Sequence, residues 1–170
     1  MSGEPVLLGS LHSRDGQGVV LMKDRFDAGI DDLWQALTRS SRLACWYGEV
    51  QADLSEGSEF HVRIDLAGER TGRVEVWEPP TRLVLTMRDP DRQPGQPEET
   101  VIDARLSAED AHTLLVWEEC GMPVALLPAY GAGIQIHVEH LADYVTGREL
   151  RDAQARWSEL FPAYEAQGVS

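Results

Sequence analysis

Residues 134–147 read IQIHVEHLADYVTG. The apolar side chains of this stretch recur at the spacing of one helical face, at Ile134, Val138, Leu141 and Val145. Gly147 ends the pattern, so the stretch predicts a long helix with one apolar face. No other segment outside the C-terminal tail predicts a helix long enough to cover a sheet, and the residues before it follow strand patterns.

Most of the chain upstream alternates between apolar and polar residues, with the period of two that is typical of a half-buried strand. Near the N-terminus, Asp15-Gly16 separates two such runs and predicts a hairpin. Further breaks occur at the Pro79-Pro80 pair and in the loop at 89–99, which holds three prolines and a glycine. About seven antiparallel strands are expected, at 6–12, 18–26, 60–66, 70–77, 83–87, 101–106 and 113–120.

Two short helices are predicted between the second and third of these strands. Asp31 and Asp32 suit the first turn of one helix, because carboxylates there complement the helix dipole. Ser40 or Ser41 can cap the second helix, and Gly48 is expected to end it. This order of strands and helices leaves no parallel crossovers, so the chain is α+β, with a curved antiparallel sheet wrapped around the long helix.

The domain is expected to span 1–146, followed by a helical extension at 147–170. This extension carries an apolar stripe at Leu150, Ala153, Trp157, Leu160, Phe161 and Tyr164. Pro162 is expected to bend or interrupt its helix. An apolar stripe of this size needs a partner surface. It packs on the same domain, covers a cavity mouth or forms a two-fold interface in a homodimer.

Composition excludes several classes of function. The 170 residues include 15 Lys and Arg against 29 Asp and Glu, a net charge of −14 that would repel a nucleic-acid backbone. The two short helices could be mistaken for a DNA-reading pair, but the second offers only Arg42 as a base-reading cation. Cys45 and Cys120 stand in no metal or disulfide pattern. Neither a signal core nor a membrane span is evident, so we expect a cytoplasmic protein.

Six short motifs occur in the order found in one known family. They read Leu33-Trp34-Gln35-Ala36-Leu37, Trp46-Tyr47-Gly48, Ala52-Asp53 with Glu56-Gly57 and Phe60, Gly72-Arg73-Val74, Pro79-Pro80-Thr81-Arg82-Leu83, and Leu141-Ala142-Asp143-Tyr144-Val145. Through them, residues 18–145 resemble the activator of heat-shock protein 90 ATPase homologues, a branch of the START-like or SRPBCC superfamily that includes the birch pollen allergen. The chain departs from the family pattern at Glu56, Met87 and Ala132.

The resemblance implies a helix-grip fold with a cavity between sheet and helix. Superfamily ligands are mostly lipids, polyketides, hormones or other flat apolar molecules, so a module that binds a small apolar ligand is the leading interpretation. A cyclase-like or hydrolytic enzyme using the same cavity is the second, and a co-chaperone or protein-interaction role is the third. The known cofactor motifs are absent from the sequence, and we expect no cofactor.

Strand parity and helical face select the residues expected to line the cavity. They are Trp46, Phe60, Met87, Trp117, Glu119, Tyr130, Ile134, His137, Val138 and Leu141. His137 interrupts the apolar helix face, either as a hydrogen-bonded core or rim residue or as an acid or base. His140 lies one turn further on, but no third metal ligand is evident. Trp117 and Glu119 share a strand face, so Glu119 either points into the cavity with Trp117 or lies at the solvent rim while Trp117 is packed.

Overall fold

The computed structural model describes residues 5–95 and 98–170. Its centre is one curved antiparallel sheet of eight strands in the order β1-β2-β8-β7-β6-β5-β4-β3. The strands are β1 (Gly9–Arg14), β2 (Gln17–Phe26), β3 (Gly48–Val50), β4 (Glu59–Ile64), β5 (Gly68–Glu78), β6 (Arg82–Arg88), β7 (Thr100–Glu109) and β8 (His112–Met122). The short edge strand β3 is the one that the sequence did not predict. Within the predicted loop at 89–99, Gln96 and Pro97 lie outside the described residues.

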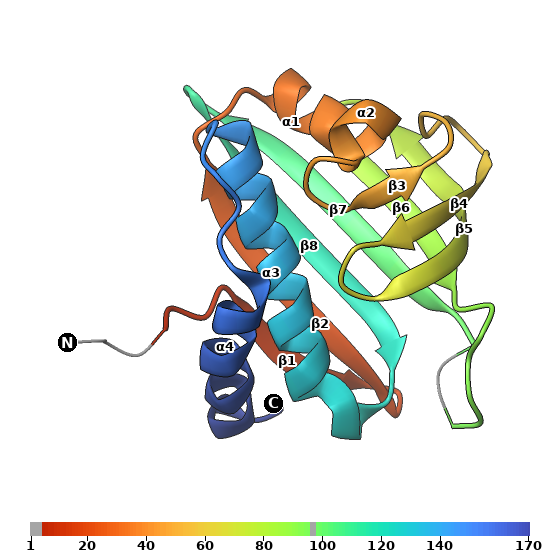
Figure 1. Ribbon diagram of the computed structural model, residues 1–170, viewed down its shortest axis with the longest axis vertical. Coiled ribbons are helices and arrows are strands. Elements are labelled where there is room, and N and C mark those ends of the chain that lie inside the picture. Colours follow the sequence, from red (N-terminus) through yellow and green to blue (C-terminus); the bar gives the residue numbers. More distant parts are fainter. Residues whose placement is uncertain (1–4, 96–97) are drawn as a thin grey trace.

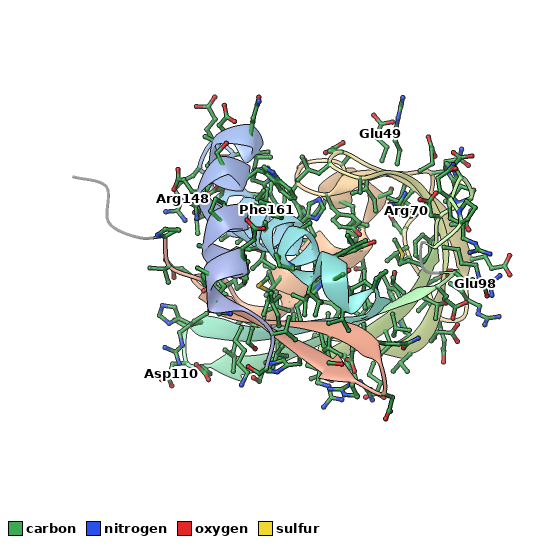
Figure 2. All side chains as sticks on the ribbon, turned by 90° about the horizontal axis from the view of Figure 1, so that it is seen from below. Glu49, Arg70, Glu98, Asp110, Arg148 and Phe161 are labelled. Atoms are coloured by element: carbon green, nitrogen blue, oxygen red, sulfur yellow. The ribbon has the colours of Figure 1, made fainter. Side chains whose placement is uncertain are left out.

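The long helix lies across the concave face of this sheet (Figure 1). The helices are α1 (Ile30–Thr38), α2 (Ser40–Leu43), the one-turn η1 (Val124–Leu126), α3 (Leu127–Val145) and α4 (Ala153–Gln167). Seen from below, the strands curve around α3, while α4 lies on the side of α3 away from β4 and β5 (Figure 2). This is the helix-grip fold, and the predicted α+β class is confirmed.

The N-terminal hairpin forms as its turn residues predict. Arg14 pairs with Gln17, and the two residues between them, Asp15 and Gly16, have positive φ angles of 53° and 80°. Such a turn matches the right-handed twist of the flanking strands. The strand itself is shorter than expected, because regular pairing begins at Gly9 rather than at Val6.

Helix α3 begins at Leu127, nearly two turns before the start that the sequence suggested after Gly133. Pro128 occupies its first turn, where a missing N–H costs nothing. Gly131 lies inside the helix because its neighbours approach closely: a Cβ there would stand 2.9 Å from Leu11 Cδ2 and 3.2 Å from the Tyr164 ring. This glycine therefore serves tertiary packing and does not break the helix.

The expected cap and stop of α2 are both wrong. Residue Arg39 is the N-cap, and the carboxylate of Asp53 accepts hydrogen bonds from Ser40 N at 2.8 Å and Ser40 Oγ at 3.0 Å. The orphan N–H is thus satisfied by a residue 13 positions away. Gly48 belongs to β3, where a Cβ would collide with the Arg63 carbonyl, so it permits close strand pairing.

Helix α4 packs against α3 and the N-terminal strand. Leu160 and Tyr164 are fully buried, and the helix continues past Pro162 without interruption. The chain end pairs with β1, because Ser170 N donates to Leu11 O at 2.9 Å. No helix in the described part of the chain is long and apolar enough to cross a membrane.

Candidate functional site

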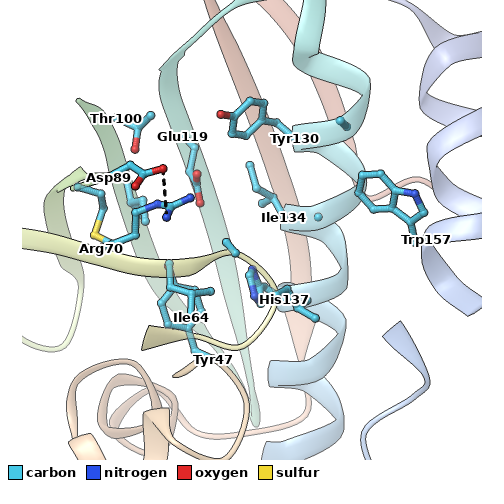
Figure 3. A pocket seen from close by; sticks show the side chains of 16 residues that line it. Tyr47, Ile64, Arg70, Asp89, Thr100, Glu119, Tyr130, Ile134, His137 and Trp157 are labelled. Carbon is cyan, nitrogen blue, oxygen red and sulfur yellow. Dashed lines mark ion pairs between the residues drawn. The ribbon is translucent and has the colours of Figure 1, made fainter. Parts of the chain in front are cut away.

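A cavity of about 280 Å³ lies between α3 and the half of the sheet formed by β4 to β8 (Figure 3). Its lining residues are Tyr47, Ile64, Leu66, Ala67, Arg70, Met87, Asp89, Thr100, Ile102, Glu119, Ala129, Tyr130, Gly133, Ile134, His137 and Trp157. Five of the ten residues expected from the sequence are therefore brought together here: Met87, Glu119, Tyr130, Ile134 and His137.

One end of this cavity is polar because several inward-facing strand residues there are polar. Arg70 pairs with Val62 across β4 and β5, so both point to the concave face. The Arg70 guanidinium lies 3.5 Å from the Asp89 carboxylate through Nη1, and the same nitrogen donates to Glu69 O at 2.7 Å. Glu119 and Tyr130 lie beside this ion pair in Figure 3. A ligand would meet cationic, acidic and hydroxyl groups at this end.

Glu119 projects from β8 into the cavity and not to the outer rim. Its pairing partner on the neighbouring strand β7 is Ile102, which also lines the cavity. Trp117 Nε1 donates a hydrogen bond to Glu119 Oε1 at 3.0 Å. Burial raises the pKa of Glu119 to about 7, against the Trp117 hydrogen bond and the Arg70 charge, which both lower it. At neutral pH this carboxyl group therefore exists in both protonation states.

His137 points from α3 toward Tyr47 and Ile64 (Figure 3). Its ring centroid lies 4.9 Å from that of Tyr47, and its Nε2 is buried without a hydrogen-bond partner among the described residues. Burial, together with the nearby His140, lowers the pKa of His137 to about 3, so the imidazole is neutral at physiological pH. A buried polar atom left unpaired is costly, so Nε2 is open to a hydrogen bond with a further group.

Three of the expected aromatic residues line a different, apolar space next to the cavity. Its volume is about 30 Å³, roughly the volume that one water molecule occupies in the liquid. Trp46, Phe60 and Trp117 line this space, and Met87 lies between it and the larger cavity. Trp46 is anchored there by Nε1, which donates to Ala36 O at 2.9 Å. These side chains form packed core beside the cavity.

Val138 and Leu141 line neither space, and both are buried in the core. His140 does not join His137 at a metal, because its Nε2 lies 2.9 Å from Arg151 O. In the described ranges, no group of three or more His, Cys, Asp or Glu side chains is arranged to hold a metal ion.

Sequence reasoning missed several lining residues, notably Tyr47, Arg70, Asp89, Thr100 and Trp157. Parity would have found some of them. Val74 and Ile102 are buried strand residues. Arg70 lies on the same strand face as Val74, and Thr100 lies on the same strand face as Ile102.

Trp157 comes to the cavity from α4. Its ring stacks on Phe161 with centroids 5.3 Å apart, and the residue remains 39% exposed. Leu66, in the turn between β4 and β5, is 44% exposed and also lines the cavity, although its alternation predicted a buried strand residue. These two side chains place the cavity mouth between that turn and α4.

Solved structures of similar fold include CalU16 from Micromonospora echinospora, with 24% sequence identity, a TM-score of 0.73 and coverage of 94% of both chains. DynU16, a protein from the dynemicin biosynthetic locus, has 24% identity and a TM-score of 0.70 over 82% of this chain and 51% of that one. MLL2253 from Mesorhizobium loti has 22% identity and a TM-score of 0.68, covering 78% of this chain and 99% of its own.

At these identities the likeness establishes the fold. No curated protein matches the chain. The family model described as activator of Hsp90 ATPase homolog 1-like protein matches residues 27–146, which include α1 to α3 and most of the cavity. The chain therefore belongs to the family of activator of Hsp90 ATPase homolog 1-like proteins.

Proposed function

We propose that the protein binds one small, mainly apolar molecule in the cavity between α3 and the sheet. The observation that carries this proposal is the cavity of about 280 Å³ itself, whose lining combines apolar side chains with polar groups, among them Arg70, Glu119 and His137. Ligand sites of this kind combine apolar walls with a few orienting polar groups. The fold supports the proposal because it is a ligand-binding fold.

Native mass spectrometry of the purified protein, with solvent extraction of whatever copurifies, tests this proposal. We expect a complex with a mass increase of one small molecule, or saturable binding of a member of a panel of fatty acids and aromatic polyketides. The absence of any bound molecule together with no affinity across that panel would contradict it.

Gly133 offers a way to block the cavity without disturbing the core. It lies on the cavity side of α3, and a Cβ at this position meets no heavy atom within 4 Å. We expect Gly133→Phe to fill the cavity and to abolish ligand binding while the protein stays folded. Gly133→Ala adds only a methyl group and should retain binding, with a gain of about 0.5–1 kcal/mol in stability because glycine is unfavourable inside a helix.

Calorimetric titration and thermal melting of both variants make the comparison. If Gly133→Phe binds ligand as well as Gly133→Ala does, the ligand lies elsewhere on the protein.

An enzyme acting on the same bound molecule is a second candidate, favoured by Glu119. A carboxyl group whose pKa is about 7 is matched to proton transfer near neutral pH, and Tyr130 lies beside it. His137, with its pKa near 3, is a poor base at that pH. Once a substrate is identified, Glu119→Gln should reduce turnover by at least a hundredfold. Unchanged turnover would remove Glu119 from the mechanism.

A further inference from the structure

The cavity presents hydrogen-bonding groups in two separate places. Tyr130 and His137 both face it from α3 and are seven residues apart, which corresponds to about 10 Å along a helix axis. Tyr130 lies at the end that holds Arg70 and Glu119, while His137 lies near Ile64 (Figure 3). Between them on α3, the residues that line the cavity are Gly133 and Ile134, which are apolar. A ligand that satisfies both places needs two polar groups at opposite ends of an apolar body.

The group that meets His137 is best satisfied by a hydroxyl. Nε2 of a neutral imidazole either accepts or donates a hydrogen bond, depending on the tautomer. A hydroxyl can do both and therefore satisfies either tautomer. A carboxylate can only accept, and its charge would be buried beside Tyr47 without a cationic partner at this place.

The other end offers donors. In the part of the chain that the structure describes, the contacts of Arg70 use only Nη1, so Nη2 and Nε retain N–H groups for a ligand. Glu119, when protonated, adds an O–H donor. Asp89 already balances the Arg70 charge, so an anionic ligand gains little attraction here and would repel Asp89 and ionised Glu119. An uncharged acceptor, such as a carbonyl oxygen, fits this end.

We infer that the ligand is an uncharged molecule with an apolar ring body, a hydroxyl group that bonds His137 Nε2 and a carbonyl oxygen that accepts from Arg70 and Glu119. This inference rests on the proposed function of the cavity. It narrows the ligand class from lipids and polyketides in general to hydroxylated ring ketones, and it places fatty acids outside the class.

A series of probes on one ring skeleton tests this inference. The probes are a hydroxynaphthyl methyl ketone, acetylnaphthalene without the hydroxyl, naphthol without the ketone, and hydroxynaphthoate with a carboxylate in place of the ketone. We expect the hydroxyketone to bind most tightly. Each of the other three should bind about tenfold more weakly, the loss of one net hydrogen bond, or in the last case the cost of a buried charge.

Substitution of His137 assigns the hydroxyl to its partner. His137→Phe should weaken the hydroxyketone about tenfold and leave acetylnaphthalene unchanged, because only the first uses Nε2. His112→Gln is the matched control: His112 is an exposed histidine 3.7 Å from Asp27 and lies outside the cavity, so both affinities should remain at wild-type values. The comparison within the wild-type protein stands even if His137→Phe fails to fold.

Three outcomes overturn the inference. Equal binding of all four probes would leave the cavity as a ligand site but remove the two anchors. Tightest binding by hydroxynaphthoate would show that the polar end selects an anion. Binding of none of them, in a protein that also copurifies with no ligand, would overturn the inference and the proposed function together.

Discussion

Replacing Arg156 with methionine should destabilise the protein by about 2–3 kcal/mol, because it leaves a buried carboxylate without its main partner. Glu139 on α3 is only 6% exposed. Arg156 on α4 binds it through two nitrogens, with Nε 2.8 Å from Oε1 and Nη2 2.7 Å from Oε2. Gln135 donates to the same carboxylate at 3.0 Å, and Arg151 lies 3.6 Å away. These remaining contacts keep the expected loss below that of a wholly isolated charge.

Urea unfolding followed by circular dichroism measures this loss. The double variant Glu139→Gln with Arg156→Met removes the charge as well as its partner, so it should recover at least half of the lost stability. Arg14→Met is the control, because it breaks a more exposed ion pair, Arg14 to Glu118 at 3.0 Å, and should leave the free energy of unfolding nearly unchanged. Equal losses for Arg156→Met and Arg14→Met would show that the α4 ion pair contributes no more than a surface pair.

The Arg156 contact also bears on the cavity. Trp157, which lines the cavity mouth, is the next residue along α4, so the same ion pair that fixes the helix fixes this side chain. Loosening α4 should therefore expose Trp157 further, and a red shift of tryptophan emission in Arg156→Met would accompany the lost stability.

The features of the fold that follow from local sequence could be predicted. The two-residue turn at Asp15-Gly16 is specified by the backbone conformations that these two residues prefer. The alternation of β4 is specified by the residues of that strand alone. The start of α3 could not be predicted in this way. The helical pattern in the sequence starts only after Gly133, and only the contacts of Gly131 with Leu11 and Tyr164 explain why a glycine lies inside the helix. The prediction of the α2 cap was wrong for the same reason, because the carboxylate that accepts from Ser40 N belongs to Asp53, which is distant in sequence.

The residues of the candidate site could likewise be predicted only in part. Parity indicates that Trp117 and Glu119 share one face of β8, but it does not say which of them meets packed side chains and which meets open space. That depends on where α3 crosses the sheet. Parity alone would have added Arg70, whereas Trp157 depends on the docking of α4 and has no signal in the strand pattern.

Glu119→Gln should stabilise the unliganded protein by about 3 kcal/mol at pH 8 and have little effect at pH 4, because its carboxyl pKa is raised to about 7 in the folded state. Below the ordinary pKa near 4.5, the group is protonated in both the folded and the unfolded chain and contributes nothing. As the pH rises toward 7, the unfolded chain loses its proton first, so the folded state becomes progressively less stable. Above 7 both states are ionised, and the full penalty of the buried charge remains.

The neutral amide of glutamine keeps the size of the side chain and can still accept from Trp117 Nε1, so the variant removes the penalty and little else. Relative to wild type, the free energy of unfolding of the variant should begin to rise near pH 4.5, grow up to about pH 7 and then stay at a constant excess up to pH 8. Glu118→Gln, at the neighbouring position on the opposite face of β8, should not produce that rise. A wild-type curve that runs parallel to that of Glu119→Gln would contradict the raised pKa, and with it the role of Glu119 as a hydrogen-bond donor at neutral pH. A ligand carbonyl that accepts from the protonated carboxyl would hold its proton to higher pH, so such a ligand should stabilise the wild-type protein more at pH 6 than at pH 8.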